Sequence, residues 1–208
     1  VMPAEMVTAE AVNFVVTHAR GLLCMPISGE RLDKLEMPLM VVSNTEIKHH
    51  TAFTVSVDYN KHTTTGISAS DRAATIRAMI DPSARAEDFS RPGHLFPLRC
   101  HPGGVLARAG HTEAIVDLCK MADLYPAGVV CEIMNEDGTM ARMPDLETFA
   151  EHHGLRILSI TQIISHRRRH ERLIERVAEA RLPTKYGEFT AIAYKSAVDV
   201  GEHIALTI

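Results

Sequence analysis

Hydrophobic positions recur along this chain at the spacing of helices and short strands in alternation. Val12, Val15, Val16 and Ala19 lie at helical spacing behind Thr8, a residue type typical of a helix N-cap. Further helices are predicted over residues 68–80, 112–122 and 145–153 and from 161 onward. Short strands are predicted at 22–27, 53–57, 129–133 and 155–160. This alternation indicates an α/β (α+β) fold, in which helices pack on a mixed β-sheet.

Polar residues mark where several of these elements begin and end. Ser68 and Asp71 have the spacing of a helix capping box, and Asp81-Pro82 ends the helix that follows. Thr112 is predicted to cap the next helix. Residues 84–110 are rich in Gly, Pro, Arg and His, which indicates a long functional loop.

The pattern changes near residue 171. Residues 171–180 are charged and helix-forming, whereas the pattern from Tyr186 onward is β-like and is still open at Ile208. An apolar β-ribbon without partners is not a finished domain. We therefore predict one domain over residues 1–170. A linker and the first strands of a second, incomplete domain are predicted over 171–208.

The composition is that of a folded, soluble protein. The chain has 208 residues, of which 46% are hydrophobic and 23% charged, and a net charge of −4, so no nucleic-acid surface is indicated. The short basic run at 167–169 is interpreted as a solvated helix face. No apolar run approaches the length of a membrane span, and the start of the chain does not resemble a signal peptide. The four scattered cysteines indicate a reducing compartment, so a cytoplasmic location is expected.

A glycine just before a predicted helix marks the first candidate site. In Arg108-Ala109-Gly110-His111-Thr112-Glu113, the N–H groups at the helix start can bind an anion such as phosphate, and Arg108 adds a charged fork. His111 lies at the same place and could ligate a metal through a neutral imidazole nitrogen. A capped turn without chemistry explains the same residues.

Two further segments suit proton transfer. Arg91-Pro92-Gly93-His94 forms a turn that displays His94 beside a cation, which favours general acid–base work; an ordinary surface turn fits equally well. Glu132 follows an apolar run, and burial there would raise its pKa and suit a general base. The alternative for Glu132 is a strand-edge carboxylate that faces solvent, with Cys131 turned inward.

The remaining candidate residues, a cysteine and two pairs of histidines, carry weaker evidence for a functional role. Cys24 lies in an apolar stretch and is expected in the core, with a catalytic or site-lining role as the alternative. The adjacent pairs His49-His50 and His152-His153 diverge on a strand or a helix, so they are expected on the surface and not as metal chelates.

Taken in order, several segments resemble motifs of one family, the 3,4-dihydroxy-2-butanone 4-phosphate synthases. These segments are Gly66 to Arg72, Arg91 to Arg99, Gly103 to Leu106, Arg108 to Glu113, Pro126 to Glu132 and Asp137 to Arg142. The resemblance covers about residues 3 to 168. Residues 176–189 are similar to the start of GTP cyclohydrolase II, which is fused behind the synthase in many bacteria and plants.

The resemblance implies a lyase of riboflavin biosynthesis. Such an enzyme converts D-ribulose 5-phosphate to 3,4-dihydroxy-2-butanone 4-phosphate and formate. It depends on Mg²⁺, or on Mn²⁺ in its place, and the ion stabilises anionic enediol character. The family is homodimeric, with its sites at or near the subunit interface, so the expected partners are a sugar phosphate and a second copy, without nucleic acid or membrane.

Residue roles follow from the same resemblance. The implied catalytic residues are His94, Glu132 and Cys24. Glu132 is implied to contact substrate hydroxyls, and His94 could act in the site of the neighbouring subunit. His111 is implied as a metal ligand. The residues implied to bind substrate are Arg108, Ala109, Gly110, His111, Thr112, Glu132 and Thr65.

One departure from the family pattern concerns the start of the chain. The family carries an acidic loop, D-x-E-x-R-E-N-E-G-D, just before the position that Val1 holds here, and that loop supplies a second metal ligand. The first domain is therefore expected to lack its N-terminal strand and acidic loop. We expect poor Mg²⁺ binding and little or no turnover from the chain as given.

Two other functions fit parts of the sequence. One is a non-catalytic dimerisation scaffold for the cyclohydrolase, against which the presence of His94, His111 and Glu132 speaks. The other is a His-rich metal hydrolase, although no HExxH-type pair is present.

Overall fold

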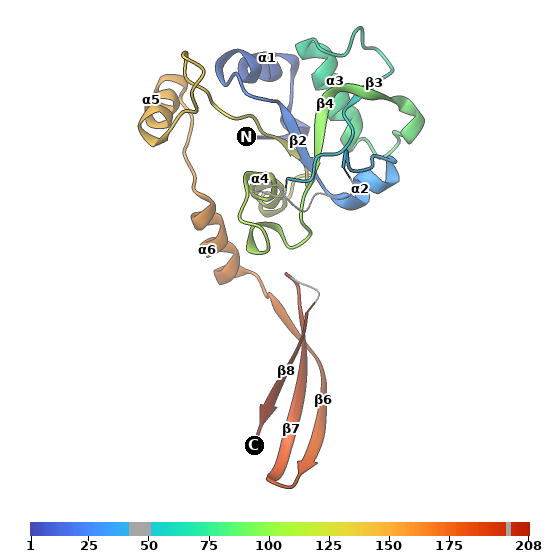
Figure 1. Ribbon diagram of the computed structural model, residues 1–208, viewed down its shortest axis with the longest axis vertical. Helices are drawn as coiled ribbons and strands as arrows, with labels where there is room; N and C mark the ends of the chain where they lie inside the picture. Colours follow the sequence, from blue (N-terminus) through green and yellow to red (C-terminus); the bar gives the residue numbers. More distant parts are fainter. Residues whose placement is uncertain (42–50, 199–200) are drawn as a thin grey trace.

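A mixed β-sheet organises the first part of the chain in the computed structural model, which describes residues 1–41, 51–198 and 201–208 (Figure 1). Its strands are β1 Met2–Pro3, β2 Cys24–Ile27, β3 Val57–Tyr59, β4 Phe89–Arg99 and β5 Gly128–Val129. β4 lies between β2 and β3, parallel to β2 and antiparallel to β3. β1 pairs antiparallel with β5, and isolated bridges from Cys24 to Val130 and from Ile27 to Ala127 join that pair to β2.

Helices pack on both faces of this sheet. They are α1 Ala9–His18, α2 Gly29–Lys34, α3 Ala69–Ile80, α4 His111–Met121, α5 Met143–His153 and α6 Ile160–His170. Leu23, Met25 and Ile27 pack into a core with residues of α1, α2 and α3. Val130 packs instead against a cluster that includes Ile115 of α4. Because neighbouring residues of a strand face opposite sides, Cys24 and Val130 lie on the face that α4 covers.

Two predicted helix starts are confirmed at the level of single hydrogen bonds. The Thr8 hydroxyl accepts from the Ala11 N–H at 3.2 Å, and the Ser68 hydroxyl accepts from the Asp71 N–H at 3.0 Å. α3 ends at Asp81, as Asp81-Pro82 predicted. Asp71 does not complete a capping box, because its carboxylate binds the preceding loop instead.

The prediction of a long loop over 84–110 is wrong, because residues Phe89–Arg99 form the central strand β4. Its Pro, Gly and Arg content hides a buried apolar set made of Phe89, Leu95 and Leu98. Position 93 requires glycine because a Cβ there would stand 2.1 Å from the carbonyl carbon of Val57. The glycine that made this segment resemble a loop therefore lets β3 and β4 pack closely.

Other element boundaries also differ from the prediction. Residues 155–159 form no strand and leave Leu155, Ile157 and Leu158 about half exposed. α6 begins behind Ser159, whose hydroxyl accepts from the Gln162 N–H at 3.2 Å. Thr112 is the second residue of α4 and does not cap it, since the N-cap is Gly110.

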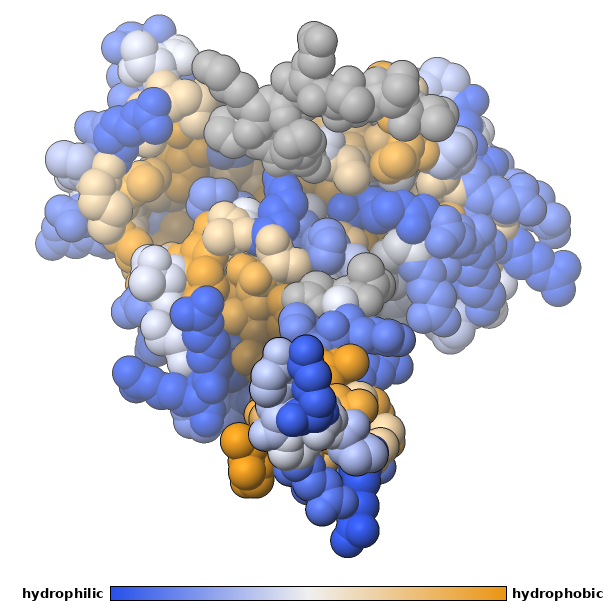
Figure 2. All heavy atoms as spheres, turned by 60° about the horizontal axis from the view of Figure 1, so that its bottom comes forward, coloured by the Kyte–Doolittle hydropathy of each residue, from blue (hydrophilic) through white to orange (hydrophobic). Residues whose placement is uncertain are grey.

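The last part of the chain is an antiparallel ribbon of β6 Ile174–Thr184, β7 Gly187–Ser196 and β8 Glu202–Thr207, which extends away from the first part (Figure 1). The β-like interpretation from Tyr186 onward is confirmed, whereas the helix-forming interpretation of 171–180 is wrong. Pairing with β7 determines the conformation there, because cross-strand contacts override local propensity. Hydrophobic side chains such as Ile174 and Ile204 stay at the surface of this ribbon, which comes forward in Figure 2.

Within the residues that the structure describes, no helix has both the length and the apolar character that crossing a membrane requires.

Candidate active site

A buried carboxylate shapes the start of α4. Glu113 is 1% exposed and accepts hydrogen bonds from the His101 N–H at 3.0 Å and from Arg108 Nη1 at 2.5 Å. Gly110 lies against this pair, where a Cβ would stand 2.5 Å from Arg108 Nη1. A side chain at position 110 would push Arg108 away from Glu113, so glycine lets the loop close tightly onto the helix.

The first turn of α4 has the geometry of an anion site, but the positive charge that Arg108 was expected to add there is paired with Glu113. His111 is the first residue of the helix and is exposed. N–H groups of a first helical turn have no acceptor inside the helix, and their partial positive charge suits phosphate. The Arg108 guanidinium, however, is paired with Glu113 and also donates to the Thr51 hydroxyl at 3.1 Å. An anion at this position would therefore be bound mainly by main-chain N–H groups.

His94 forms a pair with Asp58 that the sequence did not reveal. Asp58 Oδ2 lies 2.7 Å from His94 Nδ1, and Asp58 Oδ1 accepts from the His94 N–H at 2.8 Å. With Nδ1 donating to the carboxylate, Nε2 is the ring nitrogen left for proton transfer. A carboxylate that orients an imidazole in this way is a recurring arrangement in acid–base catalysis.

Gly66 makes room for this carboxylate. A Cβ at Gly66 would stand 2.1 Å from Asp58 Oδ2, and its φ of +91° is unfavourable for any residue with a side chain. Asp71 fixes the same loop by accepting from the Thr64 hydroxyl at 2.7 Å and the Gly66 N–H at 3.0 Å. The hydrogen bond from Thr64 is the largest cause that lowers the pKa of Asp71. Thr65 is thereby displayed, exposed, next to the Asp58–His94 pair.

Glu132 lies at the surface, so the solvent-facing alternative holds. Its side chain is exposed, and Oε2 accepts from the Leu22 N–H at 3.1 Å. Gly21 permits this approach, because a Cβ there would stand 2.5 Å from the Glu132 carbonyl oxygen. The burial on which the general-base interpretation depended is absent at Glu132, and only a solvent-accessible role remains open to it.

The strand register brings Glu132 and His94 to one end of the sheet. Cys24 pairs with Phe96 of β4 and bridges to Val130. His94 precedes Phe96 by two residues and Glu132 follows Val130 by two, so both lie beyond the same end of β2. The Leu22 N–H, two residues before Cys24, donates to Glu132 Oε2. The next bridge, from Arg20 to Ile133, is shifted by one residue relative to the bridge from Cys24 to Val130, so strand alternation does not determine the face on which Glu132 lies.

The Cys24 thiol is buried on the sheet face that α4 covers. It is 3% exposed, and burial, together with the nearby Glu132 and Cys131, raises its pKa to about 12. The thiol is therefore protonated near neutral pH, which favours a site-lining role over a nucleophilic one.

The described residues do not by themselves form a metal site. Across 1–41, 51–198 and 201–208, no group of three or more His, Cys, Asp or Glu side chains is arranged to hold an ion. His111 offers one imidazole, whereas Mg²⁺ requires a near-octahedral set that is rich in oxygen. The pair His49-His50 lies outside the described residues, while His152 and His153 lie on α5, away from His111.

A cleft lies elsewhere on the surface of the described residues. It measures about 720 Å³ and lies between α1, the turn at 134–136 and α5, with His18 and His153 on its walls. No predicted site residue lines it. The candidate residues His94, His111 and Glu132 thus lie outside this cleft.

Residues 1–166 match the model of the 3,4-dihydroxy-2-butanone 4-phosphate synthase family. The chain belongs to this family. Residues 175–208 match the GTP cyclohydrolase II family, so both resemblances seen in the sequence are confirmed. The two matches lie on either side of the change in pattern near residue 171.

The synthase chain is similar to proteins named riboflavin biosynthesis protein RibBA. It is 53% identical to the RibBA of Endomicrobium trichonymphae over 203 residues, which cover 98% of the chain and 50% of that relative. It is 52% identical to the RibBA of Synechocystis over 205 residues, which cover 98% of the chain and 37% of that relative. The chain thus spans half the length, or less, of these curated relatives.

Solved synthase structures confirm the fold. The chain superposes with a TM-score of 0.89 and 45% identity on RibBX, a two-domain 3,4-dihydroxy-2-butanone 4-phosphate synthase from A. baumannii, covering 99% of the chain and 60% of that structure. It superposes with a TM-score of 0.76 and 42% identity on a synthase in complex with two magnesium ions, covering 81% of the chain and 83% of that structure. The expected mixed α+β fold is therefore confirmed.

Proposed function

We propose that this chain carries the lyase unit that converts D-ribulose 5-phosphate to 3,4-dihydroxy-2-butanone 4-phosphate and formate. In this proposal it is one half of a bifunctional protein with GTP cyclohydrolase II. The observation that carries the proposal is the Asp58–His94 pair, which lies toward the same end of the sheet as Glu132, inside the part that matches the synthase family. The reaction needs no co-reactant, because a five-carbon phosphate divides into a four-carbon phosphate and formate.

The start of α4 is proposed to hold the substrate phosphate. Its N–H groups would bind phosphate oxygens at the helix N-terminus, beside Thr112. Gly110 keeps this end open, and Arg108, locked onto Glu113, holds the loop in place instead of moving to the ligand. The sugar carbons would then extend from the phosphate toward Cys24 and Glu132 on the sheet.

Proton transfer is proposed to fall to His94 and Glu132. His94 Nε2 would take the proton from C1 to give the enediol, and Asp58 would stabilise the imidazolium that forms. Glu132, exposed and fixed through Oε2 to the Leu22 N–H, would accept hydrogen bonds from substrate hydroxyls and exchange protons with them. Loss of one water, a skeletal shift, addition of one water and release of C4 as formate complete the reaction, so no net water is consumed.

A divalent ion is the family's expected cofactor, and a related synthase structure contains two magnesium ions. Among the described residues, His111 is the one that we carry over as a candidate ligand for Mg²⁺ or Mn²⁺. One imidazole does not make a magnesium site, so no step above is routed through the ion.

We also propose that the protein works in the cytoplasm as a homodimer. The four described cysteines are free thiols, which suits a reducing compartment. Leu22, next to Glu132, is 44% exposed, so the candidate site adjoins apolar surface that a second copy would cover.

Formate release from ribulose 5-phosphate tests the proposal. It is measured with the chain alone and with the chain extended at Val1 by the acidic segment of a RibBA relative. We expect turnover in the extended protein, and a loss of at least about 100-fold in His94→Asn. His62→Asn, which replaces an exposed histidine with φ of +60° by a residue that tolerates this conformation, should keep full activity.

The lack of a complete metal group among the described residues also favours a second candidate, a dimerisation scaffold for the cyclohydrolase. A scaffold predicts a folded dimer that neither binds ribulose 5-phosphate nor releases formate in either form. That result would remove the lyase proposal.

A further inference from the structure

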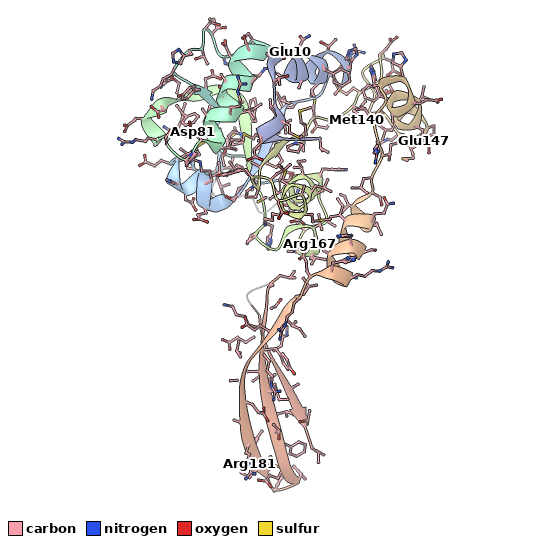
Figure 3. All side chains as sticks on the ribbon, turned by 180° about the vertical axis from the view of Figure 1, so that it is seen from behind. Glu10, Asp81, Met140, Glu147, Arg167 and Arg181 are labelled. Atoms are coloured by element: carbon pink, nitrogen blue, oxygen red, sulfur yellow. The ribbon has the colours of Figure 1, made fainter. Side chains whose placement is uncertain are left out.

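A second buried carboxylate lies on α4, one turn after Glu113. Asp117 is 1% exposed, and its Oδ2 accepts from the Val105 N–H at 2.8 Å and from Arg167 Nη1 at 2.7 Å. Arg167 comes from α6 and is labelled in Figure 3, where its side chain lies at the junction between the two parts of the molecule. Its Nη1 also donates to the Gly103 carbonyl at 3.1 Å. One guanidinium thus binds both α4 and the loop that leads into it.

The loop is built around this ion pair. Gly104 has φ of +62°, and a Cβ there would stand 2.3 Å from both Asp117 carboxylate oxygens and 2.4 Å from Arg167 Nη1. Only glycine lets the main chain pass so close over the pair. The same loop continues through Arg108 to Gly110, so its position determines where α4 begins.

Asp117 depends on Arg167 for charge compensation. Its other oxygen, Oδ1, is buried and has no hydrogen-bond partner among the described residues. Arg167 is the ion-pair partner that the structure gives it, and the Arg167 side chain is itself only 12% exposed. Removing one member of a buried pair leaves an uncompensated charge, which the surrounding structure relieves by rearranging or by admitting water.

Arg167 lies outside the part of the chain that matches the synthase family. That match ends at residue 166, and the cyclohydrolase match begins at 175. Arg167 is also paired with Glu171, which leads toward β6. Val198, which lies between β7 and β8, also approaches this loop. A Cβ on Gly103 would stand 2.2 Å from the Val198 carbonyl oxygen. The loop before α4 therefore contacts the junction helix and the ribbon.

We propose that Arg167 is a positioning residue that fixes the 103–110 loop, and with it the phosphate-binding start of α4, against the junction to the second unit. This role rests on the proposed function, since it is the sugar phosphate that α4 would bind. The interpretation of 167–169 as a solvated face is wrong for Arg167, although Arg168 and Arg169 are exposed.

The test compares Arg167→Met with Arg168→Met, two neighbouring substitutions that remove the same charge. Calorimetry gives the affinity for ribulose 5-phosphate, and amide NMR shifts report on residues 103–112 at a temperature well below unfolding. We expect Arg167→Met to weaken binding at least about tenfold, because misplacing a positioned group by an ångström is that costly. Arg168→Met should stay within about twofold of the unmodified chain, since its side chain is exposed.

A second variant separates positioning from general damage. In Asp117→Asn/Arg167→Met the buried charge is gone, while the Asn oxygen can still accept from the Val105 N–H. We expect this double variant to recover most of the lost affinity and to return the loop amide shifts toward those of the unmodified chain. If Arg167→Met does not fold, Arg167→Lys replaces it, with an intermediate loss expected because one ammonium cannot reproduce the fork.

Two results overturn the positioning role. One is an Arg167→Met chain that is folded and binds ribulose 5-phosphate as tightly as the unmodified chain. The other is a pattern of loop shifts that is the same in Arg167→Met and Arg168→Met. If the unmodified chain binds no ribulose 5-phosphate either alone or extended by the acidic segment, the proposed function fails instead, and the loop shifts still decide the positioning role.

Discussion

Asp58 determines which nitrogen of His94 is available for chemistry. Both Asp58 oxygens are engaged with His94, at 2.8 Å to its main-chain N–H and 2.7 Å to Nδ1, so the imidazole has a fixed orientation and a fixed tautomer. The Asp58 side chain is 14% exposed, which strengthens its effect on the ring relative to a solvated carboxylate.

Replacing Asp58 by Asn should therefore impair proton transfer while leaving the strand intact. We expect formate release to fall by about 100-fold in Asp58→Asn, because the amide can no longer hold Nδ1–H or stabilise the imidazolium. Asp33→Asn is the matched control, since Asp33 is a surface carboxylate 68% exposed and bonded to Arg99. Equal activities in the two variants would show that Asp58 does not act through His94.

Motif order in the sequence singles out His94, His111 and Glu132 as candidates, but does not show how their side chains are held. The Asp58–His94 pair joins residues that are 36 positions apart on neighbouring strands. No local sequence pattern predicts a contact over that separation. The sequence also does not predict whether the Glu132 side chain is buried or exposed. That depends on which face of the sheet is covered at its position.

Elements with strong local signals were predictable, and those set by tertiary contacts were not. Thr8 and Ser68 specify helix starts because the cap is a bond within one turn. β4 was missed because Pro92, Gly93 and Pro97 are poor strand formers, yet its neighbours on both sides supply the pairing. β6 was interpreted as helical for the opposite reason, since its residues favour helix in isolation.

The 103–105 turn should be one of the least tolerant points in the fold. Gly104→Ala combines the strain of a positive φ with a clash against Asp117 and Arg167, so we expect a loss of about 3 kcal/mol in the free energy of unfolding. Gly138→Ala is the control, because Gly138 has φ of +86° with nothing within 4 Å of its Cβ position. Urea unfolding should show a loss of only about 1 kcal/mol for Gly138→Ala. Equal losses would contradict the packing described for Gly104.

The contact between α1 and α5 should weaken in mild acid. The His18 and His153 rings lie 4.6 Å apart, and His153 also contacts Phe14 and Phe149. Burial, followed by repulsion from His152 and His18, lowers the pKa of His153. The unfolded chain then binds more protons than the folded chain below about pH 6.5, so stability falls as the pH drops through that window.

This dependence can be assigned to one residue with His153→Phe, which keeps a ring at the contact and removes the titration. Melting temperatures measured between pH 7.5 and 5.5 should decline less in His153→Phe than in the unmodified chain. The same decline in both would show that other groups determine it.

As a whole, the molecule is a synthase unit joined through α6 to a β-ribbon (Figure 1). The change of pattern near residue 171 lies between the two family matches, which end at residue 166 and begin at residue 175. What the sequence could not locate is the return contact from Arg167 into α4, because a three-arginine run on a helix is usually solvated and a buried Asp117 has no local signature. The placement of His94 and Glu132 toward the same end of β2 likewise follows from the assembled sheet and from no single segment.

The central claim is that this chain splits a pentulose phosphate at C4, and an isotope label tests it most directly. Ribulose 5-phosphate carrying ¹³C at C4 is incubated with the protein extended at Val1 by the acidic segment, and the products are followed by ¹³C NMR for the label and ³¹P NMR for the phosphates. We predict that the label appears in formate, that an unlabelled four-carbon phosphate accumulates in equal amount, and that both signals vanish in His94→Asn. Label retained in a phosphorylated product, or no reaction by the folded protein, would contradict the account.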